Sequence, residues 1–186
     1  MIILAGQPGA GKGTQAALLA ERDGLEWVSA GEIARQAAQH DLHIQQQLAQ
    51  GELLDSTFMT GLLEAALHSD HSNTLLEGAP RELSQADWLL SWLEAHVASE
   101  SIVIEIVISD ETTIARSQSR HRSDDTLKTI ESRIAQYHKQ TKPALQKLAE
   151  ILPFYTVDGE KPVDEVYEQL KHIILYHPKA AHEDSN

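Results

Sequence analysis

The sequence predicts an α/β fold in three layers, in which helices cover both faces of a parallel sheet of about five strands. Short apolar runs, such as TLLE at residues 74–77 and IVIEIVI at residues 102–108, alternate with longer amphipathic stretches. A glycine-rich turn separates the first apolar run from the amphipathic stretch that follows it. This alternation is typical of strand–helix–strand units around a parallel sheet.

Each expected element has its own local signal. Five runs are short, apolar and bounded by polar or turn residues, and we expect them to be strands: residues 2–5, 26–29, 74–77, 102–108 and 154–157. The stretches with a helical apolar period are residues 12–22, 84–98, 110–120, 124–152 and 162–175, the last with Pro162 in its first turn. Residues 30–68 also have a helical pattern, in two or three pieces that break near Asp41 and Gly51.

Length and charge limit the classes of protein that this chain can be. Its 186 residues suit a single domain, which we take to span residues 1–186 with a mobile polar tail at 177–186. A net charge of −13 argues against binding of a nucleic acid polymer, which needs a basic surface. The absence of cysteine excludes disulfides and thiolate metal sites. Since no apolar run is long enough to span a membrane and the start lacks the features of a signal peptide, we expect a cytoplasmic protein. We also expect it to be a monomer.

The few cations are distributed unevenly along the chain. Only four occur in the first 115 residues: Lys12, Arg22, Arg35 and Arg81. Four arginines then follow close together: Arg116, Arg120, Arg122 and Arg133. In so acidic a chain, a place that gathers positive charge is a candidate site for an anionic ligand. Charge alone leaves open the alternative that acids are simply common on the solvated surface.

The strongest motif follows the first strand directly, with the sequence GQPGAGKGT from Gly6 to Thr14. Glycines let the backbone wrap closely around a phosphate, so that N–H groups point inward at the start of the next helix. Lys12 adds a positive charge and Thr14 a hydroxyl. The strict pattern GxxxxGK[ST] has Ser or Thr directly after the lysine, whereas Gly13 intervenes here. An ordinary glycine-rich turn is the alternative, but the strand–turn–helix context favours a phosphate-binding loop.

The ending GKGTQ of this loop resembles the adenylate kinase family of nucleoside monophosphate kinases, and further motifs extend the resemblance along nearly the whole chain. SAGE at residues 29–32, followed by Arg35, is similar to the family's S-[TA]-G-[DE]-x-x-R, whose arginine holds the α-phosphate of the acceptor. Ser29 and Glu32 also form the pattern of a helix capping box, which is a structural role. Capping does not account for Arg35.

The segment LLEGAPR at residues 75–81, with Gln85 four residues later, resembles the family's DGFPRxxxQ. In the family the acid orients the water shell of Mg²⁺, the arginine contacts the acceptor phosphate and the glutamine contacts the acceptor adenine. This sequence has Glu77 in place of the aspartate and Ala79 in place of the phenylalanine. A strand that ends in an exposed Glu-Gly turn is the alternative interpretation.

Arg116, Arg120 and Arg122, followed by Asp124, Asp125 and Arg133, resemble the lid arginines and the R-x-D-D…R segment of the family. By this resemblance Arg116 lies against the ATP base and the other three arginines clamp phosphates, which planar guanidinium groups bind in a bidentate manner. The alternative is a helix end that favours cations, with Asp124 capping the next helix.

Only His121 separates Arg120 from Arg122, where the family has a lid. We therefore expect a minimal lid at about residues 119–124, weaker exclusion of water, and raised ATP hydrolysis in the absence of an acceptor. Near the end of the chain, residues 157–163 are similar to the family's loop that meets the ATP adenine, although a plain Asp-Gly turn explains them equally well on local grounds.

The resemblance implies a P-loop NTPase fold with a helical acceptor-binding insertion at about residues 30–68, and reversible transfer of the γ-phosphoryl group of Mg-ATP to a nucleoside monophosphate. The implied ATP-binding residues are Gly9, Ala10, Gly11, Lys12, Gly13, Thr14, Arg116, Arg120 and Lys161. The implied acceptor-binding residues are Ser29, Ala30, Arg35, Leu54, Gly78, Arg81, Gln85, Arg122 and Arg133. Glu77 would reach Mg²⁺ through water, and the implied catalytic residues are Lys12, Arg81, Arg120, Arg122 and Arg133.

Gln85 favours AMP as the acceptor, whereas Ala30 and the segment 122–125 look more like UMP/CMP kinases. Two other classes stay open from sequence alone. One is a P-loop kinase for a small metabolite, which leaves the set of Arg35, Arg81 and Gln85 unexplained. The other is a nucleotide-binding sensor with weak or no catalysis, which measurement of activity distinguishes from a kinase.

Overall fold

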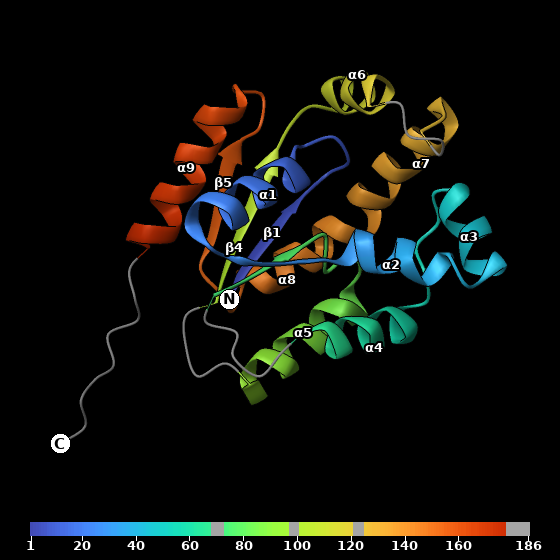
Figure 1. Ribbon diagram of the computed structural model, residues 1–186, viewed down its shortest axis with the longest axis horizontal. Coiled ribbons are helices and arrows are strands. Elements are labelled where there is room, and N and C mark those ends of the chain that lie inside the picture. The colour runs from blue at the N-terminus through green and yellow to red at the C-terminus, as the bar shows by residue number, and fades with distance from the viewer. Residues whose placement is uncertain (68–72, 97–100, 121–124, 178–186) are drawn as a thin grey trace.

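The centre of the molecule is a parallel sheet of five strands in the order β2-β3-β1-β4-β5 (Figure 1). The computed structural model describes residues 1–67, 73–96, 101–120 and 125–177. The strands are β1 (Ile2–Gly6), β2 (Glu26–Ser29), β3 (Thr74–Glu77), β4 (Ile102–Val107) and β5 (Phe154–Asp158). All pair in parallel with their neighbours, so the predicted sheet is confirmed.

Helices cover both faces of the sheet, and each face has its own apolar core. One core joins Leu4, Leu75 and Ile104 of the sheet to α1 (Lys12–Asp23) and α9 (Val163–Tyr176). On the other face, Ile3 and Leu76 pack against a larger group of helices: α2 (Ala30–Ala38), α3 (Leu42–Ala49), α4 (Ser56–Ala66), α5 (Leu83–His96) and α8 (Lys142–Ala149). Figure 1 shows α1 and α9 on one side of the sheet and α5 with α8 on the other. The three-layer prediction is therefore confirmed.

The strand register brings the segments that follow the strands to one edge of the sheet. Ser29 of β2 and Leu4 of β1 both lie beside Glu77 at the end of β3. On the other side of β1, Gly6 lies beside Ile106 of β4. Since β1 lies between β3 and β4, its glycine-rich loop emerges at the middle of this edge, where ligands of open parallel sheets bind.

The three helices α2, α3 and α4 account for the helical pattern of residues 30–68, with Asp41 capping α3 and Gly51 in the connection to α4. The expectation of one helix over residues 124–152 is wrong in two respects. The helix begins at Leu127 and is capped by Thr126, whose hydroxyl accepts a hydrogen bond from the Thr129 amide. A π-helical turn, η1 (Tyr137–Thr141), also interrupts it between α7 (Leu127–Gln136) and α8.

Smaller differences concern the element ends. Pro162 occupies the N-cap position, one residue before α9, instead of lying in the first turn of this helix. The first helix of the β4–β5 connection is α6 (Asp110–Ser119), which lies close to its expected bounds. Arg122 and His121, most of the expected lid and the polar tail beyond residue 177 lie outside the described residues. Among the residues that are described, no helix has the length and apolar character that crossing a membrane requires.

Candidate active site

A cavity of about 600 Å³ lies at the edge of the sheet where β1, β2 and β3 end. The loops after these strands form part of its wall, and residues of the helices α1 to α7 and of η1 contribute to the rest. Most of the residues singled out from the sequence line it: Gly9, Gly11, Lys12, Gly13, Thr14, Ser29, Ala30, Arg35, Leu54, Glu77, Gly78, Arg81, Gln85, Arg116, Arg120 and Arg133. Segments far apart in the chain therefore meet at one site.

The loop between β1 and α1 has the geometry of an anion-binding turn. Gly6 has φ +140°, and a Cβ atom there would lie 2.4 Å from the carbonyl oxygen of Ile106 on β4, so only glycine fits. Gly11, with φ 91°, precedes α1 and offers no side chain to cap it. The amide groups of the first helical turn are therefore open to an external anion.

Lys12 is positioned over this loop. Its Nζ donates hydrogen bonds to the carbonyl oxygens of Gly6 at 2.7 Å and Gln7 at 3.0 Å. The ammonium group is thereby held above the glycine-rich turn, on the cavity wall. A positive charge next to uncapped amides is the arrangement that favours phosphate.

Two further arginines, Arg35 and Arg81, line the same cavity. Arg35 pairs with Glu32 one turn earlier in α2, at 2.9 Å. Ser29 accepts a hydrogen bond from the Glu32 amide at 3.3 Å, but the carboxylate of Glu32 turns to Arg35. The pattern of a capping box is thus only half realised, because its acid orients the arginine instead.

Arg81 is exposed to the cavity but otherwise enclosed by protein atoms. This loss of hydration lowers the pKa of its guanidinium, the nearby charges of Arg133 and Arg35 lower it further, and Glu77 opposes them. An arginine stays protonated at any physiological pH, so the lowered pKa reports a charged guanidinium that has lost hydration and lies near two other cations. An anion bound here would relieve the repulsion among Arg35, Arg81 and Arg133.

Asp125 joins two of the cavity arginines. Its side chain is only 1% exposed, and its two oxygens accept from Arg133 at 2.8 Å and from Arg120 at 2.9 Å. A buried carboxylate between two guanidinium groups fixes the end of α6 relative to the start of α7. Arg120 and Arg133 are therefore held side by side on the cavity wall.

The loop after β5 lies against α6 through two contacts. Arg116 donates from Nη1 to the carbonyl oxygen of Gly159 at 2.9 Å. The carboxylate of Glu160 accepts from the Ser109 amide at 2.8 Å and from the Thr112 hydroxyl at 2.9 Å. These hydrogen bonds, the one from the Ser109 amide foremost, lower the pKa of Glu160. The structure thus brings Arg116 and the segment 157–163 together, as the interpretation of both as neighbours of the ATP base requires.

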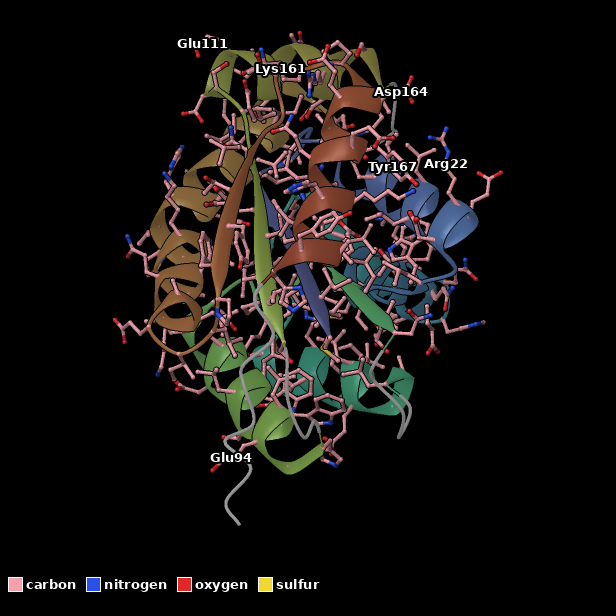
Figure 2. All side chains as sticks on the ribbon, turned by 90° about the vertical axis from the view of Figure 1, so that its left-hand side faces the viewer. Arg22, Glu94, Glu111, Lys161, Asp164 and Tyr167 are labelled. Carbon is pink, nitrogen blue, oxygen red and sulfur yellow. The ribbon has the colours of Figure 1, made fainter. Side chains whose placement is uncertain are left out.

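Some predicted residues lie off the cavity. Ala10 is buried, and its amide bonds within the turn to the carbonyl oxygen of Gln7. Lys161 is exposed and is not among the described residues that line the cavity. Figure 2 draws it at the same end of the molecule as Glu111 of α6, opposite to Glu94. Its position is determined by the loop that Glu160 anchors.

Sequence reasoning missed several residues of this site. Tyr137 lines the cavity and donates its hydroxyl hydrogen to Glu105, a buried carboxylate of β4. Burial is the main cause that raises the pKa of Tyr137, and the hydrogen bond to Glu105 raises it further. The one signal in the sequence was a single charged residue in the apolar run IVIEIVI. Thr141 and the half-exposed Trp27 also line the cavity, and neither had a local signal.

Comparison with known proteins agrees with this geometry. The family model for adenylate kinase matches residues 4–151. An adenylate kinase 1 of Synechocystis sp. is 34% identical over 179 residues, which cover 93% of this chain and 96% of that protein.

Two further relatives have similar identity and coverage. An adenylate kinase of Mycobacteroides abscessus is 34% identical over 172 residues, covering 89% of this chain and 94% of that protein. An adenylate kinase of Prochlorococcus marinus is 35% identical over 170 residues, covering 89% and 91%. The chain belongs to the adenylate kinase family and is a phosphotransferase of the nucleoside monophosphate kinase type.

Proposed function

We propose that this kinase transfers the γ-phosphoryl group of Mg-ATP to AMP and forms two molecules of ADP. The observation that carries the proposal is one cavity lined both by the phosphate-binding loop and by a separate set of arginines. A kinase with one phosphorylated substrate needs only the first. The second set supports an acceptor that is itself a phosphate ester.

The residues of the cavity divide into three roles in this proposal. Lys12 and the amides of residues 9–14 hold the phosphates of ATP, with Arg116 and the segment 157–163, including Lys161, near its base. Arg35 and Arg81 hold the acceptor phosphate, together with Ser29, Ala30 and Gly78. Arg120, Arg122 and Arg133 neutralise the charge on the transferred group, although Arg122 lies outside the described residues.

Such a cavity needs no general base. Phosphoryl transfer has a loose transition state, so that positioning and electrostatic stabilisation supply most of the rate. Arg120 and Arg133 are fixed in advance by Asp125, and Arg35 by Glu32. Charges fixed before the reaction do not have to reorganise when it occurs, and this lowers the barrier.

The residues present fit Mg²⁺. Glu77 and Thr14 line the same cavity and offer oxygen ligands, which Mg²⁺ prefers. One oxygen of Glu77, Oε2, accepts a hydrogen bond from the Ser29 hydroxyl at 2.8 Å, which fixes the carboxylate. Mg²⁺ commonly keeps several waters and binds through one or two carboxylates and the phosphates of a substrate. In this protein the ion would neutralise phosphate charge, with Glu77 orienting its water.

The position of Gln85 supports AMP as the preferred acceptor. Its side chain lines the cavity and is 3% exposed, and its Oε1 accepts from the Arg81 amide at 2.8 Å. The amide group is thereby fixed beside the phosphate-binding arginine, and Leu54 lines the same cavity. Ala30 supports the alternative of a UMP/CMP kinase. An acceptor that is not phosphorylated would offer no anionic group for Arg35 and Arg81 to bind. We further propose that the enzyme acts in the cytoplasm as a monomer.

The test is the choice of acceptor. The enzyme is incubated with Mg-ATP and with AMP, CMP, UMP, GMP or dAMP in turn, and the nucleotides are separated by chromatography. The proposal predicts that ADP forms fastest with AMP. A preference for CMP or UMP would keep the chemistry and overturn the role of Gln85, and no transfer to any acceptor would overturn the proposal.

A further inference from the structure

We infer that Thr141 positions Arg81, and that the π-helical turn η1 places Thr141 where it can do so. The inference rests on the proposed function, because it assigns to Thr141 a part in holding the acceptor phosphate. It starts from a hydrogen bond between residues 60 positions apart: the Thr141 hydroxyl donates to the Arg81 carbonyl oxygen at 2.9 Å.

Arg81 is held from three directions. Its amide donates to Gln85 Oε1 at 2.8 Å, and its Nε donates to the carbonyl oxygen of Gly78 at 2.9 Å. The hydrogen bond from Thr141 is the third, and of these three it is the one whose partner lies outside the segment from Gly78 to Gln85. Two of these contacts are local, so they fix the shape of the loop. The contact with Thr141 fixes where the loop lies relative to α7 and η1.

Arg81 needs such support because its charged side chain has lost much of its hydration. Burial is the main cause that lowers the pKa of its guanidinium, Glu77 opposes this effect, and Arg133 and Arg35 add to it. A guanidinium in such surroundings keeps one geometry only where the backbone that carries it is fixed. Preorganisation of a cation for a phosphate therefore depends on the scaffold around its main chain.

The π-helical turn brings the necessary residues onto one face. Arg133, Tyr137 and Thr141 follow one another at intervals of four and all line the cavity. In a regular α-helix each interval overshoots a full turn, so Thr141 would point about 80° away from Arg133. The hydrogen bonds of η1 span five residues, which widens the turn and reverses part of this rotation.

The turn is also anchored on both sides. Tyr137 bonds to Glu105 on β4, and Thr141 bonds to Arg81 at the edge of the cavity. A helical threonine ordinarily bonds to a carbonyl of its own preceding turn. Thr141 bonds to a distant loop instead, and its hydroxyl does not cap α8. One helix thus carries Arg133 for the transferred group and the support of Arg81 for the acceptor.

Two variants separate the hydroxyl of Thr141 from its shape. Thr141→Val keeps the branched side chain and removes the donor, whereas Thr141→Ser keeps the donor. We expect Thr141→Val to lower kcat/KM for AMP about fivefold, the usual effect of one lost hydrogen bond, with KM for ATP changed by less than about twofold. Thr141→Ser should stay within about twofold of the wild type in both.

A second readout does not depend on catalysis. Hydrogen exchange of the Arg81 Nε–H, measured by NMR, should quicken about fivefold in Thr141→Val and stay near the wild-type rate in Thr141→Ser. The positioning role is overturned if Thr141→Val matches the wild type in exchange or in the AMP kinetics. Equal losses in both variants, or parallel rises of KM for ATP and AMP, also overturn it.

The same experiment separates the two proposals. A wild-type enzyme that transfers to AMP but is indifferent to Thr141→Val refutes the positioning role and leaves the function intact. A wild type that transfers to no nucleotide refutes the proposed function, and the exchange of the Arg81 Nε–H then decides the positioning role by itself.

Discussion

Replacement of Asp125 by asparagine tests how firmly the cavity arginines are fixed. The change keeps the shape of the side chain and removes the charge that joins Arg120 to Arg133. Asp125 accepts hydrogen bonds from both arginines, two from Arg120 and one from Arg133. Counting one charge-assisted contact for each arginine at about 1.5 kcal/mol gives a loss of about 3 kcal/mol. The two arginines are 31% and 20% exposed, so water screens part of their mutual repulsion and the loss stays at the low end for a buried pair.

This loss should appear both in stability and in rate. A loss of about 3 kcal/mol lowers the thermal midpoint of a chain of this size by about 6–12 °C. Because the arginines no longer hold one geometry, kcat for transfer to AMP should fall at least about tenfold. Thermal unfolding followed by circular dichroism and steady-state kinetics measure the two effects.

Asp87→Asn is the matched control. Asp87 pairs with Lys147 between α5 and α8, but its side chain is 59% exposed. An exposed pair contributes at most about 1 kcal/mol, and this one lies away from the cavity, so both readouts should stay near the wild type. If Asp125→Asn behaves like Asp87→Asn, the arginines are not held by Asp125 and the argument from preorganisation is wrong.

Three further predictions concern the ATP side of the cavity. In Gly159→Ala a Cβ atom would lie 2.5 Å from Ile106 Cγ2, so we expect a loss of stability of about 1–3 kcal/mol and a rise of KM for ATP but not for AMP, both measurable on one preparation. Because the pKa of Glu160 is lowered in the folded protein, its carboxylate contributes fully to stability above the ordinary glutamate pKa, and this contribution is lost as the pH falls through the lower folded value. The difference in thermal midpoint between the wild type and Glu160→Gln should therefore shrink from neutral pH to about pH 3. With a single residue between Arg120 and Arg122, Mg-ATP without acceptor should be hydrolysed at an appreciable fraction of the transfer rate, and release of phosphate far below that rate would refute weak water exclusion.

Local chemistry explains why much of the fold could be predicted. The strands are apolar runs between turn residues. The phosphate-binding loop is marked by closely spaced glycines, and at Gly6 a glycine is required because the backbone of Ile106 lies so near. The capping of α2 by Ser29 likewise depends on residues within one turn. Signals of this kind lie wholly in neighbouring residues.

The features that were missed depend on residues far apart in the chain. Glu105 and Tyr137 are 32 residues apart, and Thr141 and Arg81 are 60 apart, so neither contact has a local pattern. The π-helical turn is only five residues long, too short for apolar spacing to distinguish from an α-helix. Glu160, next to Lys161, contacts Ser109 and Thr112 at sequence separations of 51 and 48 residues, so no local pattern indicates how this loop is held.

We propose that one cavity binds two phosphate-bearing substrates, with Arg81 on the acceptor. The most direct measurement is the initial rate of ADP formation from Mg-ATP and AMP for the wild type, Arg81→Met and Arg22→Met. Arg22 lies at the far end of α1, where it stacks on Tyr167 of α9 (Figure 2). We expect kcat/KM for AMP to fall about 100-fold or more in Arg81→Met and to change by less than about twofold in Arg22→Met. Equal rates in the two variants, or no ADP from the wild type, would contradict the proposal.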